Sequence, residues 1–129
     1  MVPIALRPAM CELFTVHCPG ETLFKFTTIY RRVDDENTLE TFFSETHLPL
    51  AEQLPELLKS EVSRIEGKPG GQSRFHLMYE LYFANEAADQ RSLVSEVGVE
   101  LIQALKPWGD AKLLTWFYAE AFEERSQID

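Results

Sequence analysis

The stretch TLETFFSETHLPLAEQLP, residues 38–55, carries the pattern that decides the fold. Apolar side chains recur in it at steps of three and four residues, which places them on one face of a helix, while polar side chains occupy the opposite face. A histidine continues the apolar face one turn further along the chain. The residues on this face are Leu39, Phe42, Phe43 and His47.

Both ends of this predicted helix are marked in the sequence. Acidic residues at positions 34–36 face the positive end of the helix dipole, and the side chain of Asn37 or Thr38 is expected to cap the first turn. Pro49 disfavours helical geometry at the residue before it. His47 is therefore expected close to a helix end, before a kink or a break.

Length and charge limit the classes of protein to be considered. The chain has 129 residues and a formal net charge of −9. A chain of this length is expected to form one domain and to bury about two-thirds of the surface that it exposes when unfolded. Its negative charge opposes nonspecific binding to nucleic acid and to anionic membranes, and no apolar run approaches the roughly 18 residues of a membrane span. We therefore expect no nucleic-acid partner and no membrane partner.

The chain is predicted to have three parts: an N-terminal extension over residues 1–22, a folded domain over residues 23–122 and a polar tail over residues 123–129. Both cysteines, Cys11 and Cys18, lie in the extension, where they form neither a disulfide framework nor a CxxC motif. The first ten residues contain two prolines and an arginine instead of the unbroken apolar segment of an export signal. These features predict reduced thiols and a cytoplasmic location.

Four segments have the composition of strands. Residues 22–30 are rich in β-branched and aromatic side chains, residues 57–66 are more polar and suit a sheet edge, and residues 112–122 are apolar and aromatic. Residues 75–83 alternate strictly between two faces. This alternation sends Phe75, Leu77, Tyr79, Leu81 and Phe83 to one face of the sheet, and His76, Met78, Glu80 and Tyr82 to the other.

A second helical region is predicted between the last two strands. Asn85 is a good N-cap residue, and apolar side chains recur from residue 87 to residue 105. Gly98 marks a candidate break within this region, and Pro107 is expected to end it. Residues 108–110 are expected to form a turn before the last strand.

The predicted order is strand, helix, strand, strand, helix, strand. This is the split βαβ plan of α+β, ferredoxin-like domains, in which a four-stranded antiparallel sheet carries both helices on one face. The other face, to which we assign four large apolar or aromatic side chains, is too apolar to stand in water, so a second copy of the chain is expected to cover it. The prediction is a homodimer, a dimeric α+β barrel that encloses space between two sheets. The four side chains are those of Met78, Tyr82, Trp116 and Tyr118.

Three short blocks of the sequence resemble the EthD family, small dimeric α+β-barrel proteins named for the degradation of ethyl tert-butyl ether. The blocks occur in the family's order and the resemblance covers residues 23–122. Glu56 departs from the pattern, because it stands where the family commonly has glycine. The blocks are the helix run Phe42-Phe43-x3-His47-x-Pro49-Leu50, the following Leu54-Pro55-x-Leu57, and YELYF at residues 79–83.

The resemblance implies a ferredoxin-like fold and a homodimer, because the wider dimeric α+β-barrel group shares both. It implies less about chemistry. That group includes muconolactone isomerases, cofactor-independent oxygenases of aromatic polyketides, and decarboxylases or dehydratases, and a shared fold does not select among these reactions.

His47 and Glu80 are the candidate catalytic residues. His47 matches the histidine of the family's first helix, and the ordinary pKa of imidazole, about 6.5, suits it to move protons at neutral pH. The alternative for His47 is a core histidine with both nitrogens hydrogen bonded. On an apolar face, burial would raise the pKa of the Glu80 carboxyl and make it an acid or base partner. The alternative for Glu80 is a simple ion pair with Arg64 or Arg74.

Six residues are predicted to line a ligand site inside the dimer. Three are tyrosines, whose phenolic O–H can donate to a carbonyl or enolate oxygen, although amphipathic packing explains such tyrosines as well. Met78 and Trp116 would add apolar walls, and His76, near the start of its strand, would lie at the rim. The three tyrosines are Tyr30, Tyr82 and Tyr118.

Neither a metal nor a cofactor is expected. The histidines at positions 17, 47 and 76 lack the spacing of metal ligands, and the sequence holds no nucleotide-binding motif. The leading hypothesis is a cofactor-independent isomerase, lyase or oxygenase that acts on a small apolar or aromatic molecule bearing oxygen. The alternatives are a non-catalytic binding or accessory protein for such a molecule, and an interaction module whose interior is filled by side chains.

Overall fold

The structure of the chain is a computed structural model that describes residues 22–122. The predicted extension and tail, with Cys11, His17 and Cys18, lie outside the described residues, except that Thr22 begins the first strand. Within residues 22–122, no helix is long and apolar enough to cross a membrane.

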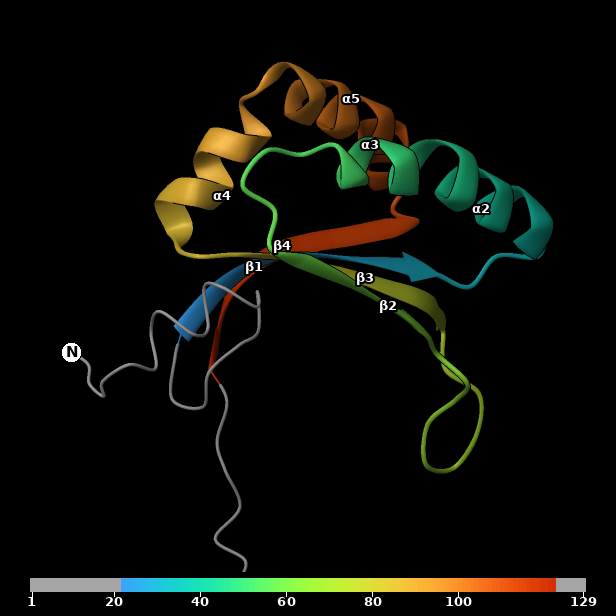
Figure 1. The fold of residues 1–129 in the computed structure, drawn as a ribbon. Coiled ribbons are helices and arrows are strands. Elements are labelled where there is room, and N and C mark those ends of the chain that lie inside the picture. The colour runs from blue at the N-terminus through green and yellow to red at the C-terminus, as the bar shows by residue number, and fades with distance from the viewer. Residues whose placement is uncertain (1–21, 123–129) are drawn as a thin grey trace, which may run out of the picture.

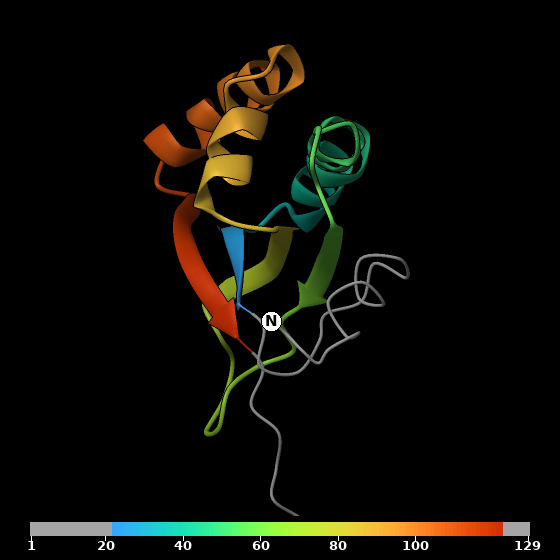
Figure 2. The same cartoon turned by 60° about the vertical axis from the view of Figure 1, so that its left-hand side comes forward.

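A four-stranded antiparallel sheet in the order β2-β3-β1-β4 carries all the described helices on one face (Figures 1 and 2). The predicted α+β, ferredoxin-like fold is therefore confirmed. The elements are β1 (Thr22–Arg31), α2 (Glu36–Phe42), the π-helical turn η1 (Phe43–His47), α3 (Leu48–Glu52), β2 (Lys59–Arg64), β3 (Phe75–Phe83), α4 (Glu86–Leu93), α5 (Glu96–Asp110) and β4 (Leu114–Phe122).

The core lies between the helices and one face of the sheet. Leu77, Tyr79 and Leu81 of β3 point into it, as the alternation of that strand predicts, together with Phe26 and Tyr30 of β1. Residues that pair directly across an antiparallel sheet share a face, so the pairing register identifies the other face as well. This helix-free face carries Lys25, Thr27, Ile29, Met78, Glu80, Tyr82 and Phe117.

The first helical segment begins earlier and ends later than predicted. Asp35 is its N-cap, with its carboxylate 3.2 Å from the backbone N of Thr38, so the expectation of a cap at residue 37 or 38 is wrong. Pro49 does not break the helix, because Leu48 keeps helical dihedrals and the chain stays helical to Glu52. The π-helical turn explains why. Its wider backbone relieves the clash of the proline ring with the preceding turn, and the proline falls in the first turn of α3, where a missing N–H costs little.

The second helical region breaks at residues 94–95 and not at Gly98. Ser95 caps α5 by accepting the N–H of Gly98, so the glycine lies in the first turn. A side chain at position 98 would overlap the carbonyl oxygens of Ser92 and Leu93, which explains the glycine as a close contact between α4 and α5. Pro107 does not end α5 either, since its own carbonyl accepts the N–H of Ala111 and the helix includes residues 108–110. The predicted cap at Asn85 is confirmed, with its side chain accepting the N–H of Ala88.

The strict alternation predicted for residues 75–83 fails at one position. Tyr30 pairs with Leu77 and Arg31 pairs with Phe75, so the pairing skips His76 and forms a β-bulge. A bulge re-aims the side chains on either side of it. Phe75 shares the face of Arg31 rather than entering the core, and His76 bonds instead to Glu40 of α2.

Candidate functional site

The centre of the candidate site is a phenol–imidazole pair in the core. Tyr30, near the end of β1, and His47, the last residue of η1, share a hydrogen bond of 2.6 Å between Oη and Nδ1. Both side chains are fully buried. His47 therefore lies over the sheet, as its position on the apolar face of the helix predicts. The Tyr30 hydroxyl of β1 orients the imidazole ring through this hydrogen bond.

Aromatic rings enclose the imidazole on several sides. Phe43 and Tyr79 contact it edge-on, with ring centroids 5.3 and 5.0 Å from that of His47. Trp108 of α5 packs edge-on against Tyr30 at 5.5 Å. These contacts come from four elements and fix the orientation of the pair, since each ring would clash with a neighbour if it turned.

Two buried polar atoms of this cluster have no hydrogen-bond partner among the described residues. They are Nε2 of His47 and Oη of Tyr79. A buried polar group left without a partner costs about 1–3 kcal/mol, so native proteins keep few of them. Their rings are in edge-on contact, with centroids 5.0 Å apart, so the two unpartnered atoms belong to one aromatic cluster.

Burial determines the protonation of the cluster. It lowers the pKa of His47 to about 3 and raises the pKa of Tyr30, so the pair is neutral at neutral pH. Burial also raises the pKa of Tyr79, and the charge of Glu52 adds to this effect. The nearby Ser60 hydroxyl lowers the pKa in part, although it does not meet the geometry of a hydrogen bond with Tyr79 Oη. A neutral imidazole can donate or accept a hydrogen bond or accept a proton, whereas the imidazolium acid needed for proton donation is absent at pH 7. The ordinary imidazole pKa assumed from the sequence does not apply at this buried position.

Glu80 lies on the opposite side of the sheet from His47. It faces the helix-free side and forms an ion pair with Lys25 of β1. The positive charge of Lys25 explains how a largely buried carboxylate is tolerated. Burial lowers the pKa of Lys25, but Glu80, together with Tyr82 and Glu61, raises it by more, so the pKa is raised overall. Glu80 and His47 cannot act on one molecule, because the sheet separates them. The alternative partners Arg64 and Arg74 are also wrong, since Lys25 takes that place.

The six predicted ligand-binding residues do not share one surface. Met78 and Tyr82 lie on the helix-free face, where the Lys59 ammonium sits 4.5 Å from the Tyr82 ring. Trp116 and Tyr118 lie on the helix side, because they pair with Thr28 and Phe26 of β1. The expectation that all four cover the outer face is therefore wrong, and Trp116 and Tyr118 pack instead around Phe26. Of the six, only Tyr30 touches His47.

His76 belongs to an ion-pair network at the bulge. Its Nε2 lies 2.8 Å from a carboxylate oxygen of Glu40, and Arg64 binds the same carboxylate through two nitrogens. The Arg64 hydrogen bonds are the main cause that lowers the pKa of Glu40 to about 2, despite partial burial. His76 is thus tied to α2 at the margin of the sheet. Among residues 22–122, no three His, Cys, Asp or Glu side chains gather as metal ligands would.

Tyr79 is the site residue that the sequence did not single out. It was predicted only to pack beneath the helices, which it does. Its position beside His47 depends on how β1 and β3 align and on the π-helical turn, and neither can be read from spacing along the chain. Tyr79 is the first residue of the YELYF block, which was therefore the available signal, although the hypotheses drawn from it concerned Glu80 and Tyr82.

Fold and site together define a class: a ferredoxin-like α+β domain with a histidine buried between its first helical segment and the sheet. The predicted resemblance to the EthD family is confirmed at the level of structure. An EthD family protein from Bacillus halodurans is 28% identical, and the match covers 78% of this chain and 99% of that one with a TM-score of 0.73.

More distant solved structures share the fold alone. SnoaB, a cofactor-independent oxygenase from Streptomyces nogalater, is 10% identical over 85% of this chain and 100% of its own, with a TM-score of 0.53. A dimeric protein of unknown function with a ferredoxin-like fold, from Bacteroides fragilis, is 17% identical over 78% of this chain and 95% of its own, with a TM-score of 0.51. No protein-family model matches the sequence, and no curated protein matches it.

Proposed function

We propose that this EthD-like protein binds a small, largely apolar molecule through an oxygen atom that His47 and Tyr79 hydrogen bond. The observation that carries the proposal is the pair of buried atoms, Nε2 of His47 and Oη of Tyr79, that have no partner among the described residues. The surrounding rings of Phe43 and Tyr30 would contact the apolar part of the molecule. A few polar groups in an apolar enclosure are the usual composition of small-molecule sites.

The neutral state of the cluster supports a neutral, oxygen-bearing ligand. Burial keeps His47 uncharged at neutral pH, so an anionic group would find no counter-charge there. A carbonyl, lactone or hydroxyl oxygen can be hydrogen bonded by both groups without burying a charge. The ligand class is therefore that of small ketones, lactones and phenols, and the proposal requires no cofactor.

Two substitutions test this binding site. His47→Asn keeps a polar group beside Tyr30 while removing Nε2, and Tyr79→Phe removes only the hydroxyl. Each is expected to weaken binding of a ligand selected from a panel of small ketones, lactones and phenols by about five- to tenfold, the cost of one buried hydrogen bond. Binding is measured by titration calorimetry. Tyr118→Phe is the control, because it removes a half-exposed hydroxyl elsewhere. Unchanged affinity in both site variants would refute the proposal.

Catalysis at the same site is the second candidate function, and the Tyr30–His47 hydrogen bond favours it. A base held by a second group and left with one free nitrogen has the arrangement of an oriented general base. Because burial lowers the pKa of His47 to about 3, the imidazole is a weak base and the substrate must carry an unusually acidic C–H. The reaction would be a cofactor-independent isomerisation, elimination or oxygenation that begins by removing this proton. SnoaB, which shares the fold, is itself a cofactor-independent oxygenase. A catalytic role predicts that His47→Ala abolishes turnover but retains most ligand affinity, and equal rates would exclude it.

The homodimer is part of the proposal, and the helix-free face supports it. Phe117 stands on that face with 42% of its surface exposed, near Ile29 and Met78. We expect Phe117→Glu to convert a dimer into a monomer, because a carboxylate would be buried without a partner in the interface. Val94→Glu is the control, since Val94 is 74% exposed on the helix side. Light scattering after gel filtration measures the mass, and a wild-type mass equal to one chain would contradict the dimer. The cytoplasmic location stays a prediction.

A further inference from the structure

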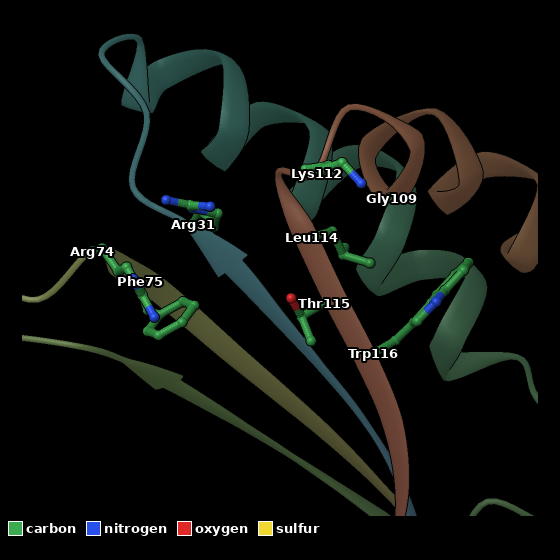
Figure 3. Close-up of a pocket in the computed structure, with 8 residues that line it drawn as sticks. All are labelled: Arg31, Arg74, Phe75, Gly109, Lys112, Leu114, Thr115 and Trp116. Atoms are coloured by element: carbon green, nitrogen blue, oxygen red, sulfur yellow. The ribbon is translucent and has the colours of Figure 1, made fainter.

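A pocket of about 500 Å³ opens at the end of the sheet where β1 ends and where β3 and β4 begin (Figure 3). His47 does not line it, so this strand-end pocket is separate from the site described above. Its polar lining is dominated by three cations and its apolar lining by three large side chains. The cations are Arg31, Arg74 and Lys112, and the apolar residues are Phe75, Leu114 and Trp116.

The charges around this pocket are unusual for the molecule. The chain carries a net charge of −9, yet no acidic side chain lines the pocket. Arg31, Arg74 and Lys112 form no ion pair within residues 22–122, and neither do Lys59 and Lys68, whereas the other five cations of that range do. A cluster of unpaired positive charge around a concave surface attracts anions and raises their local concentration. The cations that pair with carboxylates are Lys25, Arg32, Arg64, Arg91 and Lys106.

Backbone hydrogen bonds join the strand ends that carry Arg31 and Arg74. The N–H of Arg31 bonds the carbonyl of Leu113 at 2.9 Å, and the N–H of Arg32 bonds the carbonyl of Arg74 at 2.7 Å, so β1, β3 and β4 are joined at the pocket. The β-bulge places Phe75 opposite Arg31, and the Arg74 guanidinium lies 5.4 Å from the Phe75 ring centroid. The pocket is therefore assembled by the bulge, a device that often re-aims side chains at functional sites.

Lys112 follows the C-cap of α5 in the turn that leads to β4. Its φ is 62°, in the left-handed region that favours glycine or asparagine over lysine. Hydrogen bonds from Lys112 N to Gly109 O and from Leu113 N to Trp108 O are those of a Schellman motif, so the conformation is explained by the end of the helix. The motif places Lys112 at the edge of the pocket.

We propose that the strand-end pocket binds the oxyanion group of a small organic anion. Arg31, Arg74 and Lys112 would hold the charged group, and Phe75, which shares the face of Arg31, would contact its apolar body. A carboxylate and a phosphate share this chemistry, and Arg recognises both through paired N–H donors. The inference goes beyond the neutral ligand proposed at His47, because the pocket selects for charge and the buried site selects against it.

The test titrates the full-length protein with benzoate, phenyl phosphate and the uncharged benzamide. Amide and indole chemical shifts of Arg31, Phe75 and Trp116 report binding by NMR. Both anions are expected to change these chemical shifts until the site is saturated, with an affinity that falls as salt is added. Benzamide is expected to cause no change. Tighter binding of benzoate or of phenyl phosphate identifies the carboxylate or the phosphate as the preferred group.

Variants connect the binding to the cations. Arg31→Gln, Arg74→Gln and Lys112→Gln are each expected to weaken benzoate binding by about fivefold, as partly exposed ion pairs do. Lys68→Gln removes the same charge outside the pocket, so it is expected to leave affinity unchanged. Equal binding of benzamide, or pocket variants that bind as the wild type does, would overturn the proposal. Loss of the dimer in these variants without anion binding would also overturn it, because the cations would then serve a second copy of the chain.

Discussion

Lowering the pH from about 7 to about 3 is expected to remove up to about 5 kcal/mol from the free energy of unfolding, relative to a variant in which His47 cannot titrate. Burial lowers the pKa of His47 from its ordinary 6.5 to about 3. Between these two pH values the unfolded chain binds a proton at His47 that the folded chain excludes. Above pH 6.5 this difference in proton binding does not reduce the free energy of unfolding. As the pH falls from 6.5 toward 3, the free energy of unfolding decreases progressively, because protonation of His47 favours the unfolded chain.

His47→Asn isolates this effect. Asparagine does not titrate, and its amide can still hydrogen bond to Tyr30 beside it. At pH 7 the variant is expected to be less stable, because part of a buried ring is lost, but the difference from the wild type should narrow steadily as the pH falls. Denaturant unfolding at a series of pH values measures both proteins. Parallel stability profiles would contradict the burial of the imidazole.

The sequence was sufficient to predict the elements and the buried face of the first helical segment. Periodicity placed Leu39, Phe43 and His47 over the sheet, and all three are buried. Its end was not predictable from Pro49, because the effect of a proline depends on whether the preceding turn is α-helical or π-helical. The predicted position of the break in the second helical region was wrong for a similar reason. Gly98 serves a contact between two helices, and such contacts leave no mark in the local pattern.

The parts of the site that depend on pairing between strands were not predictable. Trp116 and Tyr118 share a face, as their spacing in the strand requires, but the choice of face follows from the register of β4 on β1. Aromatic side chains suit a core and a dimer interface equally well, so their chemistry does not decide the question. The bulge at His76 was not predictable for the same reason, since it depends on strand pairing. No residue type in the local sequence distinguishes an unpaired strand position from a paired one.

A second buried titratable group lies on the helix side, in the first turn of α4. Asp89 is 0% exposed, and neither of its carboxylate oxygens has a hydrogen-bond partner among the described residues. Burial, with a smaller effect from the negative charge of Glu86, raises the pKa of Asp89 to about 6. The helix dipole favours an acidic residue in a first turn, which explains the residue type but not its complete burial.

Asp89→Asn is expected to stabilise the protein at pH 8 by about 2 kcal/mol. The full shift of the Asp89 pKa, from 3.8 to about 6, corresponds to about 3 kcal/mol, and relaxation of the folded chain around the buried charge reduces it. The sign follows from proton binding: the folded chain holds a proton at Asp89 that the unfolded chain releases, so this contribution is complete below pH 3.8 and is lost as the pH rises through about 6. The two proteins should therefore have equal stability near pH 3.5 and diverge above it. Thermal and denaturant unfolding at both pH values measure this, with Glu96→Gln, which removes an exposed charge in the first turn of α5, as the control for helix-dipole effects. A less stable Asp89→Asn variant at pH 8 would show that the carboxylate has a partner in solution.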